Sequence, residues 1–239
     1  MQTLTQRALG LLVLRVILIA LSMRLAALLF GDAMIMLGAL FLLPVNLVTW
    51  LLVRRFAREE HAPISFRPGR SWPRELLWAL LWLVLFSVAF AAVINVTVFL
   101  LTGDLNTGFT TIFAVSDPEL PPGLLLALGL ATLVTYGLFN APVEEALYRG
   151  YAQSRLGGAR GIWVPSFFFG IQHMFFAPTL PGAIVYGAAF FVWGLLSAWV
   201  VARQGRLLPV TLTHLFVNLG STIPAVVFPA LMLAGVPLE

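Results

Sequence analysis

Long apolar runs constrain this chain more than any other feature. Its 239 residues are 60% hydrophobic and only 10% charged, and several runs reach the ~20 residues that a membrane-spanning helix needs. The runs lack the polar–apolar alternation of membrane β-strands. We therefore predict an all-α, polytopic transmembrane helical bundle. It has about eight spans, at approximately 8–30, 33–53, 75–101, 122–141, 162–177, 182–202, 207–221 and 222–236.

The placement of the arginines predicts how the bundle is oriented. Segment 54–74 is rich in arginine, whereas the segment after the third span holds Asp104, Asp117 and Glu119 and no arginine. Because basic residues are enriched in cytoplasmic loops, 54–74 is predicted to be cytoplasmic, and both termini with it. This loop should contact anionic membrane lipids. Short loops and the arginine bias favour a multi-pass protein of a bacterial cytoplasmic membrane.

The first span is the least regular of the eight, because Arg15 lies near its middle and Arg24 follows. A tilted or interfacial amphipathic helix is an alternative for this segment. The net charge of +4 does not indicate nucleic-acid binding, because the arginines flank apolar spans instead of forming one basic face. The absence of cysteine excludes disulfides, Cys-ligated zinc and a thiol nucleophile.

Two adjacent carboxylates, Glu144 and Glu145, lie among apolar residues. A charge near the bilayer centre costs roughly 2.5–3.5 kcal/mol on the insertion scale, so such residues indicate a functional site. Glu145 and Arg149 are four residues apart and should form an ion pair on one helix face, whereas Glu144 points about 100° away. The alternative is an ordinary helix start, with Asn140 as cap and Pro142 in the first turn.

Two histidines lie in later apolar runs. His173 follows Phe169 by four residues, and Pro165 suits the first turn of that helix. His214 and Asn218 share a helix face, and Pro209 marks that helix start. Each feature alone fits a structural role, as a hydrogen-bonded core histidine or as a polar pair that joins two helices.

Depth in the bilayer connects these segments. Counted from the nearest cytoplasmic arginines, His214, His173 and Glu144 lie about 12, 20 and 16 Å from the cytoplasmic edge, at ~1.5 Å per residue. Unrelated structural residues have no reason to share a depth. We therefore predict one buried hydrolytic centre in the cytosolic half of the bundle.

The ordered set Glu-Glu-x-x-x-Arg, Phe-x-x-x-His and His-x-x-x-Asn resembles the CPBP intramembrane proteases, which comprise type II CAAX prenyl endopeptidases and the bacteriocin-processing or self-immunity proteins of the Abi family. The resemblance covers about 140–220 and matches at Glu144, Glu145, Arg149, Phe169, His173, His214 and Asn218. It implies a catalytic core at 122–239, preceded by N-terminal helices at 1–121 that include loop 54–74. It also implies peptide hydrolysis of a membrane-associated protein or peptide, including a prenylated CAAX-type substrate.

The requirements of peptide hydrolysis suggest a role for each candidate residue. Glu144 is the predicted general base, His173 shares the water, and His214 and Asn218 donate hydrogen bonds to the oxyanion. Glu145, Arg149 and Phe169 support them. Zinc held by Glu144, His173 and His214 is an alternative, because His₂Glu sites bind zinc. No cofactor is favoured, because His-Glu-x-x-His is absent from the sequence and the three residues come from separate helices.

Two other classes of function are open at this point. A non-proteolytic membrane scaffold or immunity protein could retain the same fold. A proton-coupled transporter also uses membrane carboxylates and histidines, but it predicts matching broken helices in two halves, whereas the polar residues here gather in the second half. The sequence does not indicate an oligomeric state.

Overall fold

The computed structural model describes residues 3–31, 34–69, 71–113 and 120–236, and every regular element in them is a helix. Three long helices open the fold: α1 (Leu4–Phe30), α2 (Met34–Glu59) and α3 (Trp72–Thr102), followed by the short α4 (Leu105–Phe113). The second half contains α8 (Gly158–Met174), α9 (Leu180–Gln204), α10 (Leu208–Thr222) and α11 (Pro224–Leu233). The all-α membrane fold is thus confirmed.

One broken helix joins the two halves. It runs through α5 (Pro122–Thr132), the π-helical η2 (Leu133–Leu138), α6 (Asn140–Glu145), the π-helical η3 (Ala146–Ala152) and α7 (Gln153–Leu156). Pro142 has no backbone N–H to offer Leu138, which favours a wider turn just before it. The helix therefore does not start at Asn140. Phe139, the residue before α6, is itself helical, so Asn140 does not act as the cap that the sequence suggested.

Six helices or helix runs are long and apolar enough to cross a membrane. Among the described residues these are Leu4–Phe30, Leu40–Glu59, Trp72–Thr102, Pro122–Leu156, Leu180–Gln204 and Leu208–Leu233. The predicted count of eight is not confirmed. Helix α8 has 17 residues, or about 26 Å at 1.5 Å per residue, which is less than the ~30 Å hydrocarbon core. It begins at Gly158 and includes Pro165 in its interior, so Pro165 does not mark its start.

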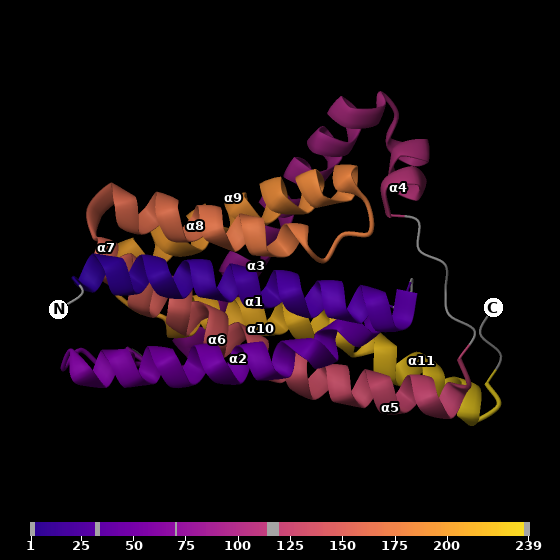
Figure 1. The fold of residues 1–239 in the computed structure, drawn as a ribbon, viewed down its shortest axis with the longest axis horizontal. Helices are drawn as coiled ribbons and strands as arrows, with labels where there is room; N and C mark the ends of the chain where they lie inside the picture. Colours follow the sequence, from indigo (N-terminus) through magenta and orange to yellow (C-terminus); the bar gives the residue numbers. More distant parts are fainter. Residues whose placement is uncertain (1–2, 32–33, 70, 114–119, 237–239) are drawn as a thin grey trace.

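The last two predicted spans form one candidate span. Only Ile223 separates α10 from α11, and the break falls at Pro224. Helix α11 packs on α5 and lies at the end of the bundle opposite the start of α1 (Figure 1). The expected placement of both termini on one side of the membrane is therefore not confirmed. The first helix, in contrast, is long and apolar enough for a candidate span over Leu4–Phe30, which favours a span over the interfacial alternative for 8–30.

Ion pairs gather the arginine-rich helix ends at one end of the bundle. Arg7 of α1 contacts Glu59 of α2 at 3.2 Å, and Arg155 of α7 contacts Glu60 at 3.0 Å. Arg206, just before α10, pairs with Glu75 of α3. Of the features that predicted the orientation, Asp104 is exposed, whereas Arg70, Asp117 and Glu119 lie outside the described residues. The cytoplasmic assignment of this end stays a prediction.

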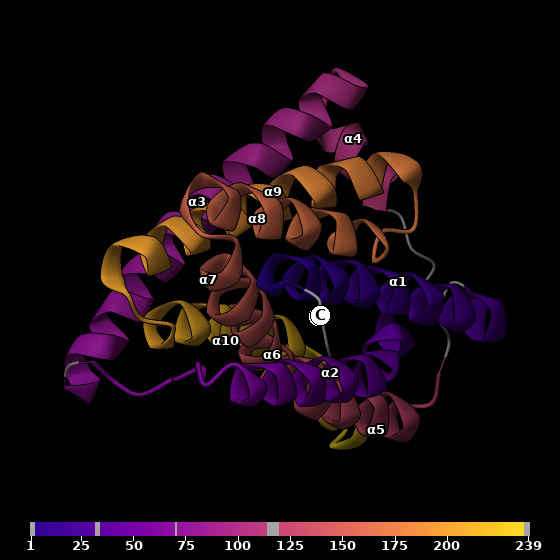
Figure 2. The ribbon, with the colours of Figure 1, turned by 60° about the vertical axis from the view of Figure 1, so that its left-hand side comes forward.

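The packing buries one face of α1 against the rest of the bundle. Helix α8 pairs with α9 along its length, and α1 lies between α8 and α2 in both views (Figures 1 and 2). Helix α1 also contacts η3, and α6 contacts both α2 and α10. The short α6, which carries the two glutamates, is thus surrounded by α2, α10 and the neighbouring α1.

Close helix packing at Gly129 is testable. A Cβ added there would lie 2.1 Å from the carbonyl oxygen of Ala225 in α11, whereas a Cβ at Gly123 of the same helix meets nothing within 4 Å. Gly129→Ala should therefore destabilise the protein by about 1–3 kcal/mol through overpacking. Gly123→Ala should leave stability unchanged or slightly raised. Thermal unfolding in detergent measures both, and equal melting temperatures would contradict the close approach of α5 to α11.

Candidate active site

Glu144 lies at the centre of a buried polar cluster and is 2% exposed. Its two oxygens have different surroundings. Oε1 accepts hydrogen bonds from Arg15 Nη2 at 2.7 Å and from Gln172 Nε2 at 2.8 Å. Oε2 has no hydrogen-bond partner among the described residues and lies 3.6 Å from His214 Nε2. One oxygen of the carboxylate is therefore held in place, and the other is available to a reactant.

Arg15 of α1 is the counter-charge of Glu144. Its side chain is 1% exposed, and besides Glu144 its guanidinium donates to Gln172, Asn46, Thr49 and Asn140 at 3.0–3.3 Å. Sequence reasoning did not place Arg15 in the site. Its position within an apolar run could have indicated a role in the site, because a charged residue in such a run is usually functional. The same observation identified Glu144.

Glu145 points to the other side of α6, as the 100° turn between neighbours requires. Its Oε1 lies 3.3 Å from Arg149 Nη1, so the predicted ion pair one turn apart is present. The same oxygen lies 2.9 Å from His214 Nδ1. All three side chains are buried. Glu145 therefore holds both the arginine of its own helix and a histidine of α10.

The two histidines differ in the ring nitrogen that they leave free. His173 Nδ1 lies 2.6 Å from the carbonyl oxygen of Phe169. A carbonyl only accepts, so Nδ1 carries the hydrogen and Nε2 is free as an acceptor. His214, in contrast, has each ring nitrogen facing a carboxylate, Nδ1 toward Glu145 and Nε2 toward Glu144. The 2.9 Å contact to Glu145 is within hydrogen-bond distance, whereas the 3.6 Å separation from Glu144 is not.

The ring of Phe169 packs between the two histidines and Arg149. Its ring centroid lies 4.6 Å from that of His173 and 6.0 Å from that of His214. The guanidinium carbon of Arg149 lies 4.3 Å from the same ring centroid, within the range of a cation–π contact. His173 also stacks on Phe190, with ring centroids 3.5 Å apart. The aromatic residue of the motif thus contacts both histidines and the arginine.

Asn218 is the motif residue whose recorded contact lies away from the carboxylates. It follows His214 by one turn of α10, is 1% exposed, and donates from Nδ2 to the carbonyl oxygen of Tyr136 at 3.2 Å. Because an amide nitrogen carries two hydrogens, a second N–H is left for a reactant. The contact also fixes α10 against the π-helical turn that precedes α6.

A metal ion does not fit the described geometry well. Glu144, His173 and His214 carry the right donor atoms for zinc. However, the described residues contain no group of three His, Cys, Asp or Glu side chains placed to hold one ion. Glu144 Oε1 is already engaged by Arg15 and Gln172. We therefore derive no step through a metal.

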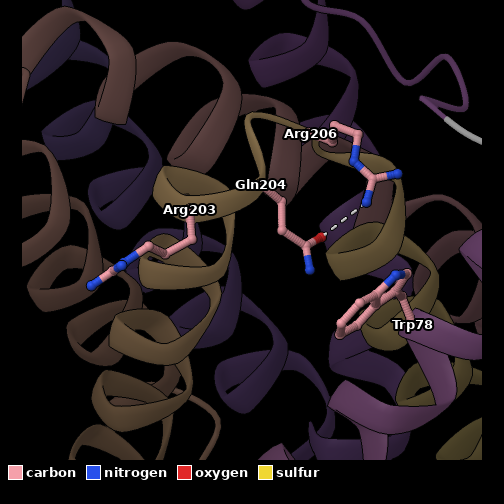
Figure 3. A pocket seen from close by; sticks show the side chains of 4 residues that line it. All are labelled: Trp78, Arg203, Gln204 and Arg206. Carbon is pink, nitrogen blue, oxygen red and sulfur yellow. Dashed lines mark hydrogen bonds between the residues drawn. The ribbon is translucent and has the colours of Figure 1, made fainter.

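A hollow of about 270 Å³ lies elsewhere, at the arginine-rich end of the bundle. Trp78, Arg203, Gln204 and Arg206 line it, and Gln204 accepts a hydrogen bond from Arg206 (Figure 3). The side chain of Arg203 points away from the other three (Figure 3). None of the residues around Glu144 lines this hollow, which is therefore separate from the candidate active site.

Comparison with known proteins agrees with the motifs. Residues 126–220 match the family model described as "Type II CAAX prenyl endopeptidase Rce1-like". This segment is therefore similar to the type II CAAX prenyl endopeptidases that the model describes. The resemblance inferred from the motifs is confirmed for this segment, and the six candidate spans support an integral, multi-pass membrane protein. Neither a curated protein nor a solved structure matches the chain.

The Rce1-like region runs from α5 to α10 and contains every motif residue, from Glu144 to Asn218. Arg15, Asn46 and Thr49 lie outside it, on α1 and α2. Part of the polar cluster around Glu144 is thus supplied by helices outside the matched segment.

The buried pair of Glu145 and Arg149 should contribute to stability. Glu145→Gln leaves the Arg149 guanidinium buried without its counter-charge, and breaking such a pair costs about 3–5 kcal/mol. Glu59→Gln is the matched control, because Glu59 pairs with Arg55 at the same spacing and also with Arg7, but its carboxylate is exposed, and exposed pairs contribute little. Denaturation in detergent compares the two variants. Similar midpoints would contradict a structural role for Glu145.

Proposed function

We propose that this protein is an intramembrane endopeptidase that hydrolyses a peptide bond of a membrane-associated substrate, with Glu144 as general base. The observation that carries the proposal is the asymmetry of the Glu144 carboxylate. Arg15 and Gln172 hold Oε1, whereas Oε2 is buried, lacks a hydrogen-bond partner in the described part of the chain and faces His214. A general base needs such an oxygen within reach of a water.

The proposed reaction uses these groups as follows. Glu144 Oε2 takes a proton from water while the water oxygen attacks the carbonyl carbon of the scissile bond. The second O–H of the water donates a hydrogen bond to the free Nε2 of His173, which orients the nucleophile, and this hydrogen stays on the new carboxyl group. The C–O bond forms, the C–N bond breaks, and the proton held by Glu144 passes to the leaving amine.

Charge that develops on the carbonyl oxygen needs donors. His214 can donate from Nε2 when both of its nitrogens are protonated, and Asn218 has an amide hydrogen beyond the one given to Tyr136. Pre-positioned donors of this kind account for about 10²–10³ in rate each. Glu145 orients His214 by accepting from Nδ1, so the two adjacent glutamates have different tasks.

The substrate is proposed to be a peptide tethered to the membrane, and a prenylated CAAX-type peptide is the first to test. The family match supports this class of substrate. Glu144 and His214 are only 2% and 4% exposed, so a peptide reaches them only when neighbouring helices separate. A lipid anchor would hold the substrate beside the bundle for long enough to use such openings.

Replacement of the base is the direct test. Glu144→Gln keeps the shape of the side chain but cannot take a proton, so cleavage of a prenylated CAAX peptide by the purified protein should fall to background. Circular dichroism and size-exclusion elution should match wild type. Glu59→Gln serves as the exposed control and should cleave normally. Wild-type turnover by Glu144→Gln refutes the general base, and an inactive wild-type protein on several anchored peptides favours the scaffold alternative.

Chelation tests the mechanism separately. Because the steps above use only protein side chains, cleavage should persist after treatment with a strong zinc chelator, measured as initial rate on the same peptide. A loss of activity that added Zn²⁺ restores would replace this mechanism with a metal-assisted one.

A further inference from the structure

We infer that Arg15 of α1 is a positioning residue for the hydrolysis, which holds Glu144 so that Oε2 faces the reacting water. The inference rests on the proposed function. It adds a residue that lies outside the segment matched by the family model, 129 positions before Glu144 in the chain.

The geometry separates Arg15 from an ordinary helix-packing residue. Its Nη2 contacts the same Glu144 oxygen that Gln172 contacts, at 2.7 Å against 2.8 Å. Gln172 in turn accepts from Arg15 Nε at 3.0 Å and from the Tyr148 hydroxyl at 2.7 Å. Arg15, Gln172 and Glu144 thus form a closed triangle of hydrogen bonds, which fixes both the position and the rotation of the carboxylate.

The remaining donors of Arg15 anchor the triangle to the scaffold. Nη1 donates to Asn46 Oδ1 and to Thr49 Oγ1, both at 3.1 Å, and both residues belong to α2. Nη2 also donates to Asn140 Oδ1 at 3.3 Å, one turn before Glu144. The planar guanidinium therefore ties α1 to α2, α6 and α8 at one point. Lysine, with a single ammonium, could not reproduce these directions.

Charge is the second contribution. The charged and titratable groups around Glu144 are Arg15 from α1, His214 from α10 and the nearby His173 from α8. Tyr136 of η2 and Tyr148 of η3 also lie within electrostatic reach of its carboxylate, while Arg149 is committed to Glu145. Arg15 is the permanent cation among the groups that contact Glu144. It therefore keeps the carboxylate anionic, which is the form that accepts a proton.

Kinetics of full-length variants in detergent or nanodiscs test the inference. For Arg15→Gln we expect kcat to fall about 10²-fold, as misplacement of a catalytic group does, with KM unchanged and the acidic limb of the pH profile moved to higher pH. Arg15→Lys keeps the cation, so it should lower kcat without moving that limb. Arg24→Gln is the matched control, because Arg24 is an exposed arginine of the same helix, and it should behave as wild type.

A stability cycle supplies a readout that does not depend on activity. Arg15→Gln should lower the melting temperature, and adding Glu144→Gln should recover part of the loss, because the buried charge left behind is removed. If Arg15→Gln does not fold, the kcat of Arg15→Lys tests the positioning role instead, and a reduced kcat supports it. Wild-type kcat and pH profile in folded Arg15 variants, with Glu144→Gln inactive, would overturn the positioning role alone. An active Glu144→Gln would overturn the proposed function instead.

Discussion

The ion pair between Arg15 and Glu144 is the interaction on which the candidate site depends. An unpaired ion in a low-dielectric interior costs several kcal/mol even after relaxation. The bundle offsets that cost by bringing a guanidinium to 2.7 Å and by giving it four further acceptors. Because these acceptors belong to different helices, the need to solvate one carboxylate also determines how those helices are arranged.

This constraint explains why one face of α1 packs against the bundle. A helix whose sequence is apolar all round could face lipid on every side, and many α1 residues do so. Arg15 could not, because lipid offers no hydrogen bonds. The face of α1 that carries Arg15 therefore packs against α2 and α8. Leu11, Leu12 and Ile19 lie on this same face and are buried. The N-terminal helix is thus tied to the Rce1-like region by a polar contact in addition to apolar packing.

Much of the site followed from local spacing in the sequence. Glu145 with Arg149, Phe169 with His173 and His214 with Asn218 each lie four residues apart on one helix, and helix geometry alone places such residues on one face. Their convergence followed from depth. The contact from Arg15 to Glu144 could not be predicted in this way, since neither spacing nor depth states which face of α1 meets α6.

The span count was less predictable, because Pro224 interrupts a helix without reversing it, and Pro165 lies inside a helix instead of starting one.

The adjacency of Glu144 and Glu145 has a physical purpose in this arrangement. Neighbouring residues of a helix point about 100° apart, so Glu145 can bind Arg149 and His214 while Glu144 binds Arg15 and Gln172 on another side of the helix. His214 contacts both, at Nδ1 and at Nε2. Glu145 fixes the ring so that Nε2 faces the Glu144 side, and it is itself fixed by Arg149. Separating the glutamates by one further residue would place them on nearly opposite faces, and no single histidine could then bridge them.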